Sequence, residues 1–160
     1  MQDVERTYYP SGELKSEVFV VNGKRNGEYK LYRETGCDYN NMSSIDSFGK
    51  LHIICTYVDG KRNGEYKEYF KKRVALYEDE KCNSQTDSFG QLYIICTYID
   101  GKLNGEEKIF HRNGQLYRIC SYIDGKKNGL EKEYFCSGKI FKIRSYNNFN
   151  YFGYDVFISS

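Results

Sequence analysis

The chain has 160 residues and a formal net charge of +2, and 39% of its residues are hydrophobic, 17% aromatic and 29% charged. This aromatic content excludes an intrinsically disordered chain, and so small a net charge gives no overall attraction for nucleic acid. No apolar run approaches the roughly 20 residues that a membrane-spanning helix needs. The length suits a single domain, which we expect over residues 1–160.

The first element in the chain is a partial repeat. The segment Tyr8-Tyr-Pro-Ser-Gly12 matches Tyr134-Phe-Cys-Ser-Gly138 near the other end of the chain. Residues 1–6 lack the apolar core of a signal peptide. We therefore expect an intracellular, cytoplasmic chain whose thiols are reduced.

Complete repeats follow at about 12–36, 49–72, 90–113 and 114–137, with a degenerate copy at about 138–158. Gly90, Gly114 and Gly138 stand 24 residues apart, which defines the period. Insertions at about 37–48 and 71–89 lengthen the earlier intervals, and each runs into an Asp-Ser-Phe-Gly segment. Such insertions often lie on the binding side of an array. An elongated hairpin without a role is the alternative.

Each repeat is expected to form two strands. In the copy at 49–72, Leu51, Ile53, Cys55 and Tyr57 share one face because they alternate with their neighbours. The Gly-Lys-x-Asn-Gly motif that follows favours a tight hairpin, since Gly and Asn tolerate positive φ. Successive copies predict an all-β fold, a single curved antiparallel β-sheet of consecutive hairpins with ten to eleven strands and almost no helix.

The pattern Tyr-x-x-Gly-Lys-x-Asn-Gly-x-x-Lys-x-Tyr resembles the MORN repeat, in the variant of bacterial antitoxin-like proteins and of giant DNA viruses of amoebae. It stands at Tyr57–Tyr69, Tyr98–Phe110 and Tyr122–Tyr134, and at residues 12–32 with Val20 in place of the first Tyr. The resemblance implies a protein scaffold, a dimerisation module or a membrane-lipid tether, and it implies no catalytic residues. The common pattern favours His where this chain has Asn26, Asn63, Asn104 and Asn128.

One candidate binding surface is a row of lysines in the predicted turns, at Lys24, Lys61, Lys102 and Lys126. In an array they would form a basic edge able to meet phosphates of lipid or nucleic acid. Asp59, Asp100 and Asp124 precede three of them and cancel much of that charge. A solvated row of turns is therefore the favoured interpretation.

A second candidate surface is an aromatic column at Tyr32, Tyr69, Phe110 and Tyr134. Lys30, Lys67, Lys108 and Lys132 share its face, and their stems could lie along the rings. Packing within the sheet is the favoured interpretation, and a trough that binds a peptide is the alternative.

The cysteines and histidines predict no metal, cofactor or catalytic site. Cys55, Cys96 and Cys120 occupy one repeat position. Equivalent strands lie about 9–10 Å apart, too far for a disulfide or a shared zinc ion, so these cysteines are expected in the core. His52 and His111 occupy unrelated positions, and the sequence contains no Gly-x-Ser-x-Gly motif, no phosphate-binding Gly loop and no His-Glu-x-x-His motif.

We expect a non-enzymatic scaffold that binds a protein partner, or a second copy of itself, through a sheet face or the insertions. Composition alone favours a structural or assembly component of a large DNA virus, for which the virion is the alternative location to the cytoplasm. An antitoxin-like immunity partner that neutralises a toxin by binding is one alternative, and a tether to an anionic membrane surface is another. Nucleic acid is not an expected partner.

Overall fold

The computed structural model describes residues 2–34, 51–70, 90–147, 150–151 and 156–157. The regular elements in these ranges are all β-strands: β1 (Gln2–Tyr8), β2 (Leu14–Val21), β3 (Lys24–Tyr32), β4 (Leu51–Val58), β5 (Lys61–Tyr69), β6 (Leu92–Ile99), β7 (Lys102–Leu103), β8 (Gly105–Phe110), β9 (Leu116–Ile123), β10 (Lys126–Lys127), β11 (Gly129–Tyr134), β12 (Ile140–Asn147), β13 (Asn150–Tyr151) and β14 (Val156–Phe157).

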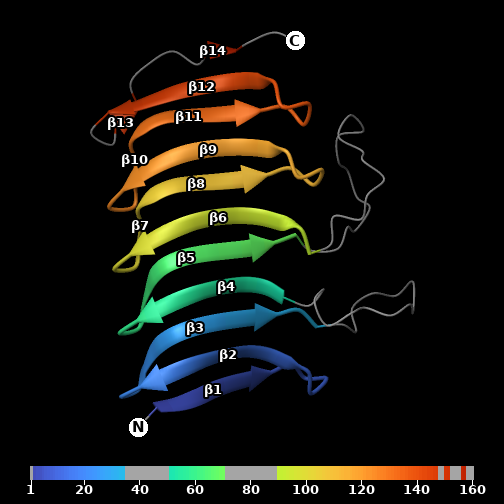
Figure 1. The fold of residues 1–160 in the computed structure, drawn as a ribbon, viewed down its shortest axis with the longest axis vertical. Helices are drawn as coiled ribbons and strands as arrows, with labels where there is room; N and C mark the ends of the chain where they lie inside the picture. Colours follow the sequence, from blue (N-terminus) through green and yellow to red (C-terminus); the bar gives the residue numbers. More distant parts are fainter. Residues whose placement is uncertain (1, 35–50, 71–89, 148–149, 152–155, 158–160) are drawn as a thin grey trace, which may run out of the picture.

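The 14 strands form one sheet in which the strands from β1 to β12 follow one another in chain order. Figure 1 shows curved strands that run back and forth in a single layer from β1 at one end to β12 near the other. The predicted all-β fold of consecutive hairpins is confirmed. Within the described ranges, nothing forms a helix with the length and apolar character that a membrane span requires.

The strand count differs from the expected ten to eleven. The pairs β7/β8 and β10/β11 are each one strand interrupted at an asparagine, Asn104 or Asn128. If each pair counts as one strand, twelve remain, and the two-residue strands β13 and β14 explain the excess over ten. Both short strands pair with β12, so they cover part of its outer edge.

The tight turns begin one residue earlier than the Gly-Lys-x-Asn-Gly motif suggests. Val58 pairs with Lys61, so Asp59 and Gly60 alone form the loop, with φ of 48° and 82°. Positive φ at both central residues is the signature of a type I′ turn, which matches the twist of a hairpin. The same geometry occurs at residues 22–23, 100–101 and 124–125. The lysines predicted in the turns therefore begin the second strand of each hairpin.

The Asn-Gly part of the motif forms a backbone bulge instead of a turn. Cys55 pairs with Tyr66 and Tyr57 pairs with Arg62, so three residues of β5 oppose Thr56 alone. Gly64 lies in this bulge with φ of 100° and pairs with Tyr98 of the next repeat. The bulge lets β5 move away from β4 while it stays in register with β6.

At the other ends of the strands, hairpins close through longer turns. His111 N donates to Gln115 O at 2.8 Å and Gly114 N donates to His111 O at 2.9 Å. Phe70 N donates to Gln91 O at 2.8 Å in the same way, so β5 and β6 meet at this edge as well. The predicted insertions, about 37–48 and 71–89, lie outside the described residues.

The core is a row of side chains that crosses one face of the sheet. Its buried apolar members are Val18, Cys55, Tyr66, Cys96, Ile109 and Cys120. Tyr66 pairs with Cys55 on one side and with Cys96 on the other, and half-buried Tyr29, Tyr57 and Tyr98 pack around them. Because the described strands form one layer, this core depends on contacts between neighbouring strands.

Three of the tight turns are also bonded to the strand that follows the preceding turn. The turn amides of Gly60, Gly101 and Gly125 donate to the carbonyls of Arg25, Arg62 and Leu103 in the preceding repeat, each at 2.8 Å. The stem of Lys61 lies over Gly101, where an added Cβ would be 3.6 Å from the Cβ of Lys61. Each turn is thus held by the repeat before it.

Replacing Gly101 by Ala should lower the free energy of unfolding by about 1 kcal/mol, because L side chains rarely adopt its positive φ. Urea denaturation followed by circular dichroism measures the change. As a control, Lys102→Ala removes only an exposed ion pair with Asp124 and should cost less than about 1 kcal/mol. Equal losses in the two variants would show that the turn conformation is unimportant for stability.

Candidate interaction surfaces

Strand alternation divides the side chains between two faces of the sheet. The face that carries Cys55, Cys96, Cys120 and Tyr66 is called the cysteine face. The opposite face is called the lysine face because lysines and isoleucines alternate across it from strand to strand. In spatial order the row is Ile54, Lys67, Ile95, Lys108, Ile119, Lys132 and Ile143.

The predicted turn lysines lie at the tight-turn edge, each paired with the last residue of the preceding strand. The pairs are Lys24 with Val21, Lys61 with Val58, Lys102 with Ile99, and Lys126 with Ile123. Lys61 Nζ lies 2.7 Å from Asp100 Oδ1, and Lys102 Nζ lies 3.6 Å from Asp124 Oδ1. These exposed pairs between repeats are weak individually, but they balance the charge along the edge.

The predicted aromatic column, Tyr32, Tyr69, Phe110 and Tyr134, ends β3, β5, β8 and β11 and is half-buried. In the described part of the chain, no cation–π contact joins it to Lys30, Lys67, Lys108 or Lys132. The first three of these lysines bind glutamates instead. Tyr32 Oη donates to Glu17 Oε1 at 2.9 Å, and burial, followed by this carboxylate, raises the pKa of Tyr32 to about 12.

Backbone carbonyls of this column accept hydrogen bonds from the preceding repeat. Tyr9 Oη donates to Tyr32 O at 2.7 Å, and Arg33 Nη2 donates to Tyr69 O. His111 Nε2 lies 2.8 Å from Tyr134 O, which can only accept. Tyr9, Arg33 and His111 each follow the end of a strand. No pattern in the sequence indicates this role, because side chains of unlike chemistry fill the position.

Arginine and tyrosine side chains stack on the cysteine face. The guanidinium carbon of Arg62 lies 4.9 Å from the ring centroid of Tyr66 and 5.4 Å from that of Tyr98. Arg25 is placed similarly over Tyr29 and Tyr57, at 5.4 and 5.7 Å. Burial raises the pKa of Tyr66, as does the hydrogen bond that it donates to Glu68. Arginine stems and tyrosine rings therefore provide the cover that a second layer would give.

The cysteines of the repeat position are buried and free, as expected of core residues. Burial raises the pKa values of Cys96 and Cys120 to about 11, so both stay thiols at neutral pH. Cys136, outside this repeat position, is disulfide-bonded. No group of three metal-ligating side chains occurs among the residues that the structure describes.

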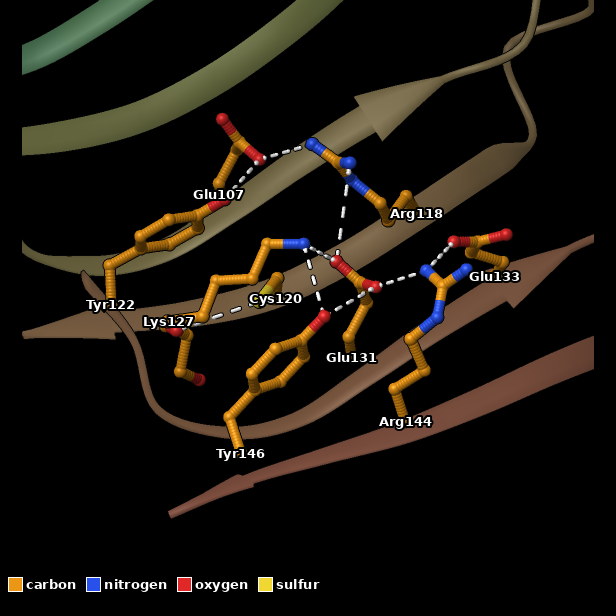
Figure 2. Close-up of polar contacts among 10 residues, drawn as sticks. Glu107, Arg118, Cys120, Tyr122, Lys127, Glu131, Glu133, Arg144 and Tyr146 are labelled. Carbon is orange, nitrogen blue, oxygen red and sulfur yellow. Dashed lines mark hydrogen bonds and ion pairs between the residues drawn. The ribbon is translucent and has the colours of Figure 1, made fainter. Parts of the chain in front are cut away.

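A network of charged side chains surrounds Glu131 on the cysteine face of the last repeats (Figure 2). Glu131 is 1% exposed, although it lies on a single-layer sheet. Its carboxylate accepts hydrogen bonds from Lys127 Nζ and, at 2.6 Å, from Arg144 Nη1, while Arg118 Nη1 lies 4.0 Å away. The stems of these cations cover the carboxylate and their charges neutralise it.

Two further carboxylates complete the network. Arg118 Nη2 donates to Glu107 at 2.7 Å, and Arg144 Nη1 donates to Glu133 at 2.7 Å. Glu107 and Glu131 stand two residues after the bulge glycine, where the earlier repeats have Tyr29 and Tyr66. The cysteine face thus changes from aromatic to charged along the array. The exchange is visible in the sequence, but its consequence depends on the strand pairing that brings Arg118 and Arg144 to these carboxylates.

Two effects act on the pKa of Glu131. Burial raises it, while the hydrogen bonds from Lys127 and Arg144 lower it, and the net shift is downward. Burial lowers the pKa of Lys127, but the bond to Glu131 outweighs it and the net shift is upward. Both shifts favour the ion pair at neutral pH.

A family model described as a MORN repeat variant matches residues 4–22, 103–124 and 127–148. Each matched unit consists mainly of two strands joined by a longer turn, such as β8 and β9. The corresponding units that include β3–β4 and β5–β6 contain the predicted insertions and are not matched. Comparison with curated proteins and with solved structures found no match.

Replacing Glu131 by Gln should lower the free energy of unfolding by about 2 kcal/mol, because Lys127 and Arg144 would lose a buried charged acceptor. Urea denaturation measures the loss. Glu106→Gln is the matched control, since it removes an exposed partner of Lys108 and should cost less than about 1 kcal/mol. Similar losses would argue against a stabilising role for the network.

The difference in stability between the natural chain and Glu131→Gln should depend on pH. The folded-state pKa of Glu131 is lowered, so its stabilising contribution is complete above the pKa of the unfolded chain. It is lost as the pH falls through the folded-state pKa. Thermal unfolding of both proteins from neutral to acidic pH should show converging midpoints. A constant difference would contradict the assigned ion pair.

Proposed function

The chain carries MORN repeat variants in three segments, and on this basis we propose that it is a non-enzymatic scaffold that docks a protein partner on the lysine face. Repeats of this kind are often involved in protein or membrane-lipid interactions. The proposal places the contact on side chains of the sheet face.

The observation that carries the proposal is a row of exposed aliphatic side chains. Val58, Ile99 and Ile123 end equivalent strands on the lysine face, and they are 45%, 54% and 45% exposed. Single exposed apolar residues are ordinary on a protein surface, whereas a repeated row on one face is typical of an interaction site.

The first strand, β1, is poorly suited to self-pairing through its outer edge. If two copies paired antiparallel through their β1 edges, with equivalent faces on the same side, the pairing would be symmetric about one residue of β1. Centring it on Glu5 opposes two Glu5 side chains, and centring it on Val4 opposes Asp3 and Glu5. Like charges directly opposite each other destabilise a sheet and protect its edges. This favours a contact through the face.

A membrane-surface tether is the second candidate, and one observation supports it. Each turn lysine is paired with an aliphatic residue at the tight-turn edge, a combination that suits anionic lipid. The ion pairs with Asp100 and Asp124 reduce the basic charge and disfavour this candidate. A role in a large DNA virus, an antitoxin-like role and a cytoplasmic or virion location stay predictions from the sequence.

The proposal predicts that the double variant Val58→Asp and Ile99→Asp loses a protein captured from native extract by cross-linking and pull-down with the intact chain. Charged groups in the row should prevent apolar contact there. The matched control is Ser11→Asp with Ser137→Asp, which adds the same charge at exposed residues of the longer turns. The control should retain the partner.

Co-sedimentation with vesicles that contain anionic lipid distinguishes the scaffold from the membrane tether. The scaffold proposal expects no salt-sensitive co-sedimentation of the intact chain. Co-sedimentation that disappears in Lys61→Gln with Lys102→Gln, in the absence of any captured protein, would favour the membrane tether and contradict the scaffold.

A further inference from the structure

The lysine face repeats one ion pair in three successive hairpins. A glutamate directly after the bulge glycine binds the lysine two residues further along the same strand. The distances are 2.6 Å for Glu28–Lys30, 2.5 Å for Glu65–Lys67 and 3.1 Å for Glu106–Lys108. Residues two apart in a strand point to the same face, so the geometry recurs with the repeat.

The fourth repeat breaks this pattern. Leu130 replaces the glutamate and is 51% exposed, although the lysine is retained as Lys132. Lys132 has no carboxylate partner among the residues that the structure describes. It is half-buried between Ile119 and Ile143, the residues it pairs with on the two neighbouring strands. A lysine in apolar surroundings is stabilised by a nearby carboxylate.

The neighbouring side chains leave this place accessible. Ser145, opposite Leu130 on β12, is small, and exposed Ile123 ends β9 on the same face. We call Ile123, Leu130 and Lys132, with the flanking Ile119 and Ile143, the Leu130 patch. It combines exposed aliphatic surface with one cation whose expected acid is missing.

We propose that the Leu130 patch binds an extended protein segment that presents an aliphatic side chain to Leu130 and a carboxylate to Lys132. The carboxylate replaces the group that Glu28, Glu65 and Glu106 supply in the other repeats. Both partner side chains lie on one side of an extended chain, two residues apart, because Leu130 and Lys132 have that spacing. This inference rests on the proposed scaffold function and adds a contact next to Ile123, at one end of the exposed aliphatic row.

The Leu130→Glu variant tests the inference without threatening the fold. It restores the acid–lysine pair that three other repeats already contain, so the stability of the sheet should be retained. The new carboxylate would occupy Lys132 from within and remove the aliphatic contact. Val4→Glu is the matched control, because it places a glutamate two residues before Arg6 on β1, at the far end of the sheet.

The probe is a display library of short random peptides selected on the intact chain. Selected peptides should carry an acidic residue two positions from an aliphatic residue. In calorimetric titrations, Leu130→Glu should weaken their binding by at least about tenfold, the effect of losing a single good contact. Val4→Glu should bind normally. Lys132→Gln should weaken binding and reduce its dependence on salt.

Three results would overturn the inference: no enriched peptide, enriched peptides without an acid, or equal binding by Leu130→Glu. Binding of the protein captured from native extract distinguishes failure of this inference from failure of the scaffold proposal. If that partner binds Leu130→Glu as well as the natural chain, the Leu130 patch is not the contact and the scaffold proposal stands. Salt-sensitive binding to anionic vesicles that is lost in Leu130→Glu would make the patch a lipid site and also overturn the inference.

Discussion

The backbone bulge at the second glycine of each repeat is the constraint on which the sheet depends. It places three residues of one strand opposite a single residue of its hairpin partner. The two additional residues leave the side-chain alternation unchanged, so Arg62 and Tyr66, four residues apart, both reach the cysteine face. Positive φ at Gly64 makes the bulge possible, and its pairing with Tyr98 links the bulge to the next repeat. One local conformation thus determines both the register between repeats and the residues that can stack.

A single layer also explains the chemistry of the core. An apolar side chain on such a sheet is shielded from water only by its neighbours, so long amphipathic side chains lie over the core residues. Arg62 lies over Tyr66 and Tyr98 in the earlier repeats, while Lys127, Arg118 and Arg144 enclose Glu131 in the later ones. The same positions therefore support either an aromatic or a charged arrangement. In the charged arrangement the carboxylates are paired with cations, Glu131 with Lys127 and Arg144 and Glu107 with Arg118, while Arg118 Nε is buried without a hydrogen-bond partner.

The repeats act as internal references for one another. The ion pairs of Lys67 and Lys108 show what the environment of Lys132 normally contains, and this makes Leu130 informative. The same reasoning separates Lys132 from the turn lysines, because Lys61 and Lys102 pair with aspartates of the next repeat as a regular part of the array. Departures from a repeat are stronger indicators of a specific contact than the repeated residues, because repetition alone is explained by the needs of the sheet.

The sequence by itself determined the all-β class, the order of the hairpins, the need for positive φ at both glycines of each motif and the buried row of cysteines. These features follow from local φ preferences and strand alternation. Only the tertiary structure decided that Asp59 and Gly60 make the turn while Gly64 makes a bulge, since both segments tolerate positive φ and pairing selects between them. It also decided the partners of Tyr9, Arg33, His111 and Glu131. Apart from the Lys127–Glu131 pair, those contacts join different strands across repeats, and their register is set by the bulge, which no local preference of these side chains encodes.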